Sequence, residues 1–249
     1  MNNILLEENE QLDDLQLDGL RIIQKKDGFK FGTDAVLLSD FAKSIYSDNT
    51  LDLCTGSGII PILMSAKTKT KKFCAIEIQQ EVAEIAKRSV ELNNLSDRIS
   101  VICQDLKNST NFFPKRSFNL ITCNPPYMKA GAALLNESDS KIIARHEVKC
   151  SLEDIISVSS QLLCQGGHFA LVHKPSRLCD IIYLLRKYEI EPKRIRFVQK
   201  TSNSCPELVL VDAMYKAKSE VIIMNPLILK NDDGEETEEL KQIYRGGKN

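Results

Sequence analysis

The chain has 249 residues, 43% of them hydrophobic, and a formal net charge of −1 at pH 7. This length suits one large α/β domain with a small appendage. No apolar run approaches the roughly 18 residues of a membrane-spanning helix. The acidic start also lacks the basic and apolar regions of a secretory signal. We therefore expect a cytoplasmic protein with no membrane association.

The charges are unevenly distributed along the chain. Residues 1–20 and residues 231–240 each carry six acidic and no basic side chains. When these acids and the three bases of residues 241–249 are set aside, residues 21–230 carry a net charge of +8. A basic body is compatible with a polyanionic partner, although a solvated surface is the commoner cause of so modest an excess.

Eight cysteines are scattered along the chain, with no C-x-x-C pair and no cluster around His146, His168 or His173. This pattern is typical of reduced core cysteines and not of a zinc site or a disulfide framework. We expect no metal.

Short apolar strands alternate with amphipathic helices from residue 49 onward. The pattern predicts strands at 50–54, 72–78, 99–105, 118–124 and 167–173, and helices at 81–95 and 151–167. Asn93-Asn94 should close the first of these helices, Ser151 should cap the second, and Gly166-Gly167 should end it. The alternation predicts an α/β fold with a mostly parallel central sheet and helices on both faces.

The flanking segments differ from this pattern. Residues 20–32 predict a β-hairpin that turns at Asp27-Gly28, before a helix that begins at Thr33 or Asp34. Residues 194–200 and 207–216 predict an antiparallel C-terminal hairpin, and the acidic residues 230–240 predict a mobile tail. The expected division is an N-terminal segment and hairpin (1–32), a main domain (33–229) and a tail (230–249).

Residues 51–58, LDLCTGSG, run from a strand into a glycine-rich turn and then a helix. Gly56 and Gly58 allow the backbone to turn sharply and to approach a ligand. The dinucleotide fingerprint is incomplete because position 61 is Pro, and a lone G-x-G is weak evidence. Asp52, just before the turn, would repel a pyrophosphate but attract an ammonium group.

Polar residues also end the next three strands. Glu77 ends the second strand, where a carboxylate can accept from both hydroxyls of a ribose, and Asp105 ends the third. Asn124-Pro125-Pro126-Tyr127 follows the fourth, where the prolines must stop the strand. Each feature alone is as consistent with a turn or a surface acid as with a site. Together they predict one crevice at the carboxyl ends of parallel strands.

These residues resemble the Rossmann-like S-adenosylmethionine-dependent methyltransferases, and among them the amino-methyltransferases with an N-P-P-Y loop. Residues 28–41 and 144–147 further resemble the bacterial tRNA1(Val) adenine-N6-methyltransferases. The resemblance implies S-adenosylmethionine as cofactor and RNA, most naturally tRNA, as partner. It implies cofactor binding by Thr33, Asp52, Cys54, Gly56, Gly58, Glu77, Ile78, Asp105 and Asn124, and catalysis by Asn124, Pro125, Pro126 and Tyr127.

The N-P-P-Y loop suits a planar amine as methyl acceptor. The Asn124 side-chain oxygen and the Pro125 carbonyl can accept its two N–H groups as the nitrogen becomes tetrahedral, and Tyr127 can stack on the base. Residues 128–150 are expected to form a loop over the substrate. The basic residues of 184–197 could extend an RNA surface, although each is individually typical of an ordinary surface charge.

Several alternatives remain open on the sequence alone. The same loop could methylate a glutamine side chain in a release factor, or a guanine or cytosine amine in rRNA. A non-catalytic RNA-binding module could keep the fold, but its glycine turn or Asn124 would then be expected to be lost. A nicotinamide-dependent dehydrogenase is disfavoured by the incomplete fingerprint and the lack of a plausible catalytic His.

Overall fold

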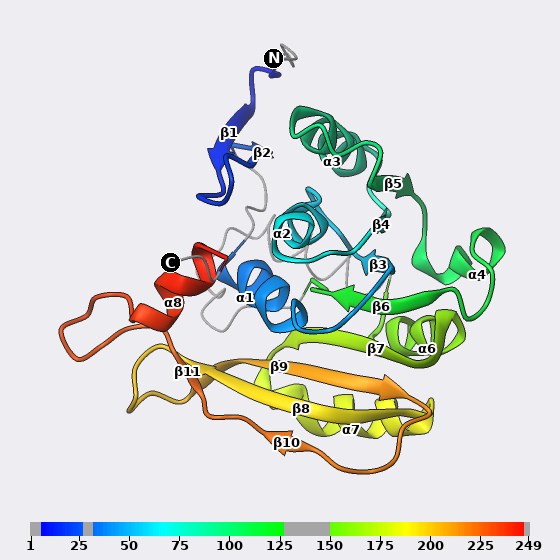
Figure 1. Ribbon diagram of the computed structural model, residues 1–249, viewed down its shortest axis with the longest axis vertical. Helices are drawn as coiled ribbons and strands as arrows, with labels where there is room; N and C mark the ends of the chain where they lie inside the picture. Colours follow the sequence, from blue (N-terminus) through cyan, green and yellow to red (C-terminus); the bar gives the residue numbers. More distant parts are fainter. Residues whose placement is uncertain (1–5, 27–31, 127–149, 247–249) are drawn as a thin grey trace, which may run out of the picture.

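A computed structural model describes residues 6–26, 32–126 and 150–246. Within this part of the chain, nine strands form one sheet in the order β10-β8-β9-β7-β6-β3-β4-β5, with β11 also paired to β8 (Figure 1). The strands are β3 (Asn49–Leu53), β4 (Lys72–Glu77), β5 (Ile99–Cys103), β6 (Phe118–Cys123), β7 (Leu163–His173), β8 (Ile190–Gln199), β9 (Pro206–Tyr215), β10 (Ile222–Ile223) and β11 (Leu227–Ile228).

The strands at the centre of the sheet are parallel, and one strand of its C-terminal part, β9, runs in the opposite direction. β3 pairs in parallel with β4 and β6, β4 with β5, and β6 with β7. β9 is antiparallel to both β7 and β8. The predicted mostly parallel sheet with an antiparallel C-terminal hairpin is confirmed.

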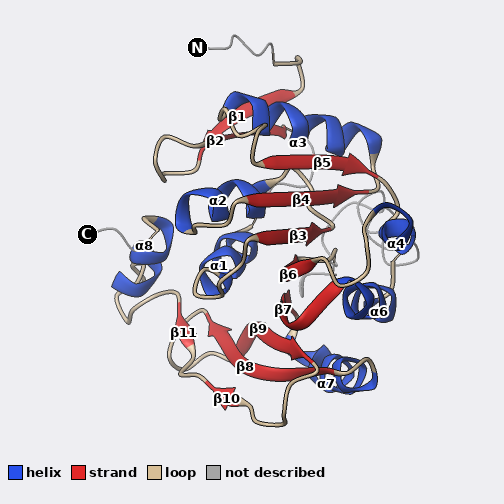
Figure 2. Cartoon of the chain, turned by 45° about the vertical axis from the view of Figure 1, so that its right-hand side comes forward, coloured by secondary structure: helices blue, strands red, loops and turns tan. Residues whose placement is uncertain are grey.

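Helices cover both faces of this sheet (Figure 2). One apolar cluster joins α1 (Thr33–Ala42), α2 (Ile59–Lys67), α3 (Gln80–Leu92) and α8 (Glu238–Tyr244) to the sheet. A second cluster lies beneath η1 (Leu106–Asn108), α6 (Leu152–Leu162) and α7 (Leu178–Lys187), next to the short α4 (Ser109–Phe112). Parallel strands buried on both faces need such covering on each side. No helix in the described ranges is long and apolar enough to span a membrane.

The ends of two helices test the predicted caps. Asn93 is the C-cap of α3, and Asn94 follows with φ 55°. Ser151 forms the predicted capping box with Asp154 at the start of α6. The prediction that Gly166-Gly167 ends this helix is wrong, because α6 ends at Leu162 and β7 begins with the next residue. Leu163 already pairs with Phe118, so the glycines lie within an irregular part of the β6–β7 ladder.

The N-terminal hairpin differs from the prediction. β1 (Glu10–Asp14) pairs with β2 (Arg21–Lys25), so the partner of β2 comes from the acidic segment before it. Glu10 tolerates burial because its carboxylate is paired with the guanidinium of Arg88 on α3. The expected turn at Asp27-Gly28 lies outside the described residues.

The expectation of a mobile acidic tail is also wrong. Thr237 caps the helix α8, and its hydroxyl accepts from the N–H of Leu240. Leu240 and Ile243, three residues apart, share one face of α8 and are buried in the cluster with α1 and α2. The composition of residues 230–240 did not indicate this helix, because Ile243, one of its two buried apolar residues, lies after residue 240.

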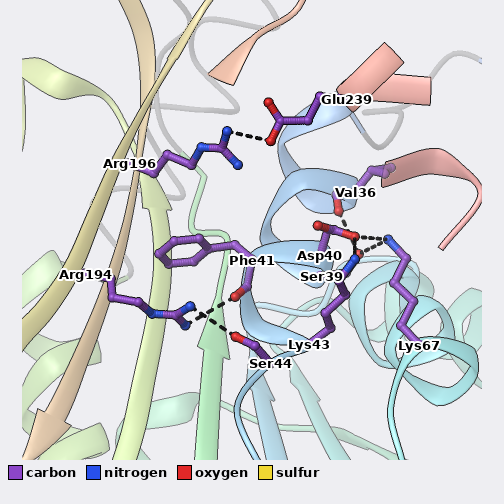
Figure 3. A network of polar contacts seen from close by, with 10 residues as sticks. All are labelled: Val36, Ser39, Asp40, Phe41, Lys43, Ser44, Lys67, Arg194, Arg196 and Glu239. Carbon is purple, nitrogen blue, oxygen red and sulfur yellow. Dashed lines mark hydrogen bonds and ion pairs between the residues drawn. The ribbon is translucent and has the colours of Figure 1, made fainter. Parts of the chain in front are cut away.

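Arginines of β8 hold the α1–α8 layer on the sheet (Figure 3). Arg194 donates to the Ser44 hydroxyl over 3.0 Å, and its guanidinium lies 4.8 Å from the centre of the Phe41 ring. Arg196 pairs with Glu239 of α8 at 2.6 Å. These two basic residues of the 184–197 segment therefore have partners within the fold.

Candidate functional site

The carboxyl ends of the parallel strands bring four of the predicted polar residues to one edge of the sheet. Asp52 lies in β3 and Glu77 is the last residue of β4. Asp105 is the second residue after β5, and Asn124 directly follows β6. The register pairs Leu53 with Cys123 and Glu77 with Cys103, so these strand ends are immediate neighbours.

Asp52 is almost completely buried, with 1% of its surface exposed. The Thr122 hydroxyl donates to its Oδ1 over 2.6 Å, and its Oδ2 has no hydrogen-bond partner in the described part of the chain. Burial raises the pKa of Asp52 to about 7, the hydroxyl groups of Thr122 and Thr55 oppose this increase, and the negative charge of Glu77 adds to it. A buried carboxylate with a free oxygen is suited to a cationic ligand, which would stabilise its charged form.

The turn after β3 has an unusual backbone. Cys54, Gly56 and Gly58 have φ angles of 58°, 57° and 85°. A left-handed conformation is unfavourable for Cys54 and is typical of functional turns. A Cβ on Gly58 would lie 3.5 Å from the Ala86 Cβ on α3, whereas a Cβ on Gly56 would meet nothing within 4 Å. The turn is therefore packed on its helix side and open at Gly56, where a ligand can approach the backbone.

Glu77 connects this turn to the next loop. Its Oε2 accepts from the Gly56 N–H and its Oε1 accepts from the Gln79 N–H, each over 3.0 Å. The side chain is 6% exposed. Each carboxylate oxygen can accept a second hydrogen bond, so the group can bind a diol while it holds both loops.

Ile78 and Asp105 lie beside Glu77. Ile78, directly after the buried strand β4, is 38% exposed, which is unusual for an isoleucine in this position. The Asp105 carboxylate accepts from the Lys107 N–H over 2.9 Å and remains partly exposed. The Gln104 N–H donates to the Glu77 carbonyl, which fixes these loops to one another. An apolar surface next to an acceptor can hold a flat, amine-bearing ring.

The segment after β6 presents a second unpartnered acceptor. The Asn124 Oδ1 is buried and has no hydrogen-bond partner among the described residues. Pro125 is buried and Pro126 is exposed. Tyr127, residues 128–149 and the 144–147 motif lie outside the described residues.

Thr33 begins α1, as predicted, but its described contact is with the C-terminal helix. The Tyr244 hydroxyl bonds to the Thr33 hydroxyl over 3.4 Å. No described contact joins Thr33 to Asp52 or Glu77. Conversely, the sequence did not single out Thr122 or Gln79, which hold the two carboxylates. A threonine inside the apolar strand NLITCN was the available signal for the first.

The described residues contain no group of three or more His, Cys, Asp or Glu side chains that could hold a metal ion. All eight cysteines are free thiols. The buried thiol of Cys123, at the end of β6, has its pKa raised by desolvation.

Comparisons with known proteins agree with this arrangement. Residues 25–188 match the family model of the methyltransferase small domain. The chain is 30% identical over 188 residues to the tRNA1(Val) (adenine(37)-N6)-methyltransferase of Porphyromonas gingivalis, covering 73% of this chain and 72% of that protein. It is 24% identical over 226 residues to the protein of the same name from Shewanella woodyi, covering 88% and 92% of the two chains.

The fold has a counterpart among solved structures. A predicted O-methyltransferase from Agrobacterium tumefaciens superposes with a TM-score of 0.70 at 22% identity, over 86% of this chain and 96% of that one. At this identity, the likeness supports the fold alone.

Proposed function

Because this chain belongs to the methyltransferase small domain family, we propose that it transfers a methyl group from S-adenosylmethionine to N6 of an adenine in tRNA. The observation that carries the proposal is the position of the unpartnered Asn124 Oδ1. It lies at the edge of the sheet where Asp52, the glycine turn and Glu77 meet.

The residues at the ends of β3 and β4 fit the methyl donor. S-adenosylmethionine, when bound, supplies a methyl group on a positively charged sulfur. Asp52 offers a buried carboxylate oxygen without a partner among the described residues, which suits the ammonium group of the amino acid part. Gly56 leaves open space over the backbone, and the Glu77 carboxylate can accept from ribose hydroxyls. Ile78 and Asp105 suit the adenine ring and its amine.

Asn124 and Pro125 act on the methyl acceptor in this proposal. An adenine amine is a poor nucleophile because its lone pair is delocalised into the ring. The Asn124 Oδ1 and the Pro125 carbonyl accept its two N–H groups as the nitrogen becomes tetrahedral, so they stabilise charge that develops in the transition state. Pro125 and Pro126 restrict the backbone and hold both acceptors in place. Tyr127 stacks on the base.

The relatives favour adenine in tRNA over the other planar amines, since the curated proteins above are named for adenine-N6 methylation. A base that reaches the sheet edge cannot stay stacked in RNA, so a loop nucleotide is the natural acceptor. The anticodon loop is our specific proposal. A tRNA acceptor also implies a cytoplasmic reaction.

Incubation with S-adenosylmethionine labelled on the methyl group and total tRNA, followed by digestion to nucleosides, tests the acceptor. We expect labelled N6-methyladenosine, and fragment mapping should place it in an anticodon loop. Label in guanosine, in rRNA alone or in a release-factor glutamine would contradict the substrate and leave methyl transfer intact. A protein that binds labelled donor and transfers no methyl to any of these would favour the non-catalytic RNA-binding module.

A further inference from the structure

Gln24, in the strand β2, has an unusual environment for a polar side chain. It is 3% exposed, and neither its Nε2 nor its Oε1 has a hydrogen-bond partner within residues 6–26, 32–126 and 150–246. Among the buried side chains that the structure describes, it is the one amide with both polar atoms unpartnered. Burial of an amide without hydrogen bonds costs free energy, so such a group requires an explanation.

The strand that carries Gln24 is held firmly, so local disorder does not explain its missing partners. The outer edge of β2 is bound by side chains of α3. The Ile23 N–H donates to the Ser89 hydroxyl over 3.1 Å, and the Asn93 amide bonds to both the N–H and the carbonyl of Arg21. The other edge of β2 pairs with β1 along its whole length.

The direction of β2 brings Gln24 towards the candidate site. Arg21 contacts Asn93 at the C-cap of α3, and Lys25 pairs with Glu81 in its first turn. β2 therefore runs antiparallel to α3, and its last residues lie where α3 follows Glu77 and Gln79. This end of β2 is at the carboxyl edge of the sheet.

The packing around Gln24 also indicates a position near the carboxyl edge of the sheet. In a strand, Gln24 lies on the same face as Ile22, which packs in the apolar cluster with α2. The start of α2 touches the middle of α3, because a Cβ on Gly58 would lie 3.5 Å from the Ala86 Cβ. Gln24 is thus buried beside α3, in a strand whose Ile22 belongs to the same apolar cluster as α2.

Three other residues at the carboxyl ends of the parallel strands have a buried polar atom without a hydrogen-bond partner among the described residues: Asp52 through Oδ2, Thr55 through Oγ1 and Asn124 through Oδ1. Asp52 and Asn124 are already assigned to ligands above. We infer that Gln24 belongs with them and that its amide hydrogen-bonds the bound methyl donor. A primary amide donates and accepts at once, which matches a ligand with carboxylate, ammonium and hydroxyl groups. This inference rests on the proposed function.

The test uses a substitution that should keep or raise the stability of the ligand-free protein and should weaken ligand binding. Gln24→Leu replaces the amide by an apolar side chain of similar size. Because it removes an unsatisfied buried polar group, the ligand-free variant should melt at or above the wild-type temperature. Its Kd for S-adenosylhomocysteine, measured by calorimetry, should rise about tenfold, since the ligand loses one or two hydrogen bonds.

Gln199→Leu is the matched control. The Gln199 Nε2 donates to the Ser204 carbonyl over 2.7 Å, so this variant loses a satisfied hydrogen bond. It should melt at a lower temperature than the wild type and bind S-adenosylhomocysteine with unchanged Kd.

Three results would overturn the inference about Gln24. The first is an unchanged Kd for S-adenosylhomocysteine in Gln24→Leu, and the second is a lower melting temperature of that variant without ligand, which would show a structural role. The third is weaker tRNA binding with unchanged ligand binding, which would assign the amide to the acceptor. A wild-type protein that does not bind S-adenosylhomocysteine would instead refute the proposed function itself.

Discussion

The Glu77 carboxylate accepts a hydrogen bond from the backbone N–H of Gly56 over 3.0 Å, across the gap between two neighbouring strand ends. The same carboxylate accepts from the Gln79 N–H. Glu77 therefore shapes the glycine turn as well as offering oxygens to a ligand. Its removal should disturb two parts of the proposed donor site at once.

Replacement of Glu77 by Ala should weaken binding of S-adenosylmethionine at least tenfold. The variant loses charge-assisted hydrogen bonds to the ribose, each worth about 1.5–3 kcal/mol, and the turn loses its acceptor. Calorimetry would measure the Kd. Glu91→Ala, an exposed glutamate at the far end of α3, is the control and should bind as the wild type does. Wild-type affinity in Glu77→Ala would mean that the ribose is held elsewhere.

Asn124→Ala should separate catalysis from donor binding. We expect the rate of methyl transfer to fall about 100-fold or more, because one transition-state acceptor is lost, with donor affinity largely retained. Single-turnover kinetics with saturating donor and tRNA would measure the rate. Asn108→Ala, an exposed asparagine near the same sheet edge, should keep full activity. Loss of donor binding with turnover unchanged at saturation would reverse the roles assigned to these residues.

Asp52 should make stability depend on pH. Its pKa is raised from 3.8 to about 7 in the folded protein, so the folded state holds a proton that the unfolded chain has released. The stability that this proton contributes is fully present below about pH 4. It is lost as the pH rises to about 7, and the free energy of unfolding falls by at most about 1.4 kcal/mol per pH unit.

Asp52→Asn has no such titration and isolates this effect. Its free energy of unfolding in urea, relative to the wild type, should increase between pH 4 and pH 7 and then level off. Thr122→Val removes the hydrogen bond that lowers this pKa, so the loss should extend to higher pH. A difference between Asp52→Asn and wild type that does not vary with pH would show that folding does not raise the pKa of Asp52.

The C-terminal helix should contribute to global stability. Leu240→Ala removes a side chain that is 4% exposed and belongs to the apolar cluster shared with α1, so we expect a loss of about 2–4 kcal/mol in the free energy of unfolding. Chemical denaturation would measure it. Gln242→Ala, an exposed position on the same helix, should change stability by less than about 0.5 kcal/mol. Equal stability of Leu240→Ala and the wild type would mean that α8 is not docked in solution.

The sequence alone was enough to predict the sheet of strands and helices and the edge at which polar residues gather. Apolar runs such as 118–123 are long enough to specify a buried strand, and the caps at Asn93-Asn94 and Ser151 depend on local hydrogen bonds. Parallel strands then place their carboxyl ends together, so Asp52, Glu77, Asp105 and Asn124 could be grouped without a structure. These features follow from periodicity and local chemistry, which a single chain displays directly.

Only the tertiary structure decided which groups are paired and which are not. The partner of β2 is the acidic segment 10–14 because the Glu10 charge is compensated by Arg88, 78 residues away. The acidic tail folds because Leu240 is buried in the apolar cluster that also contains residues of α1 and α2. Gln24 looks like any polar strand residue until its burial and its lack of partners are visible. Burial, pairing and pKa depend on contacts between distant segments, and local sequence does not encode those contacts in a readable form.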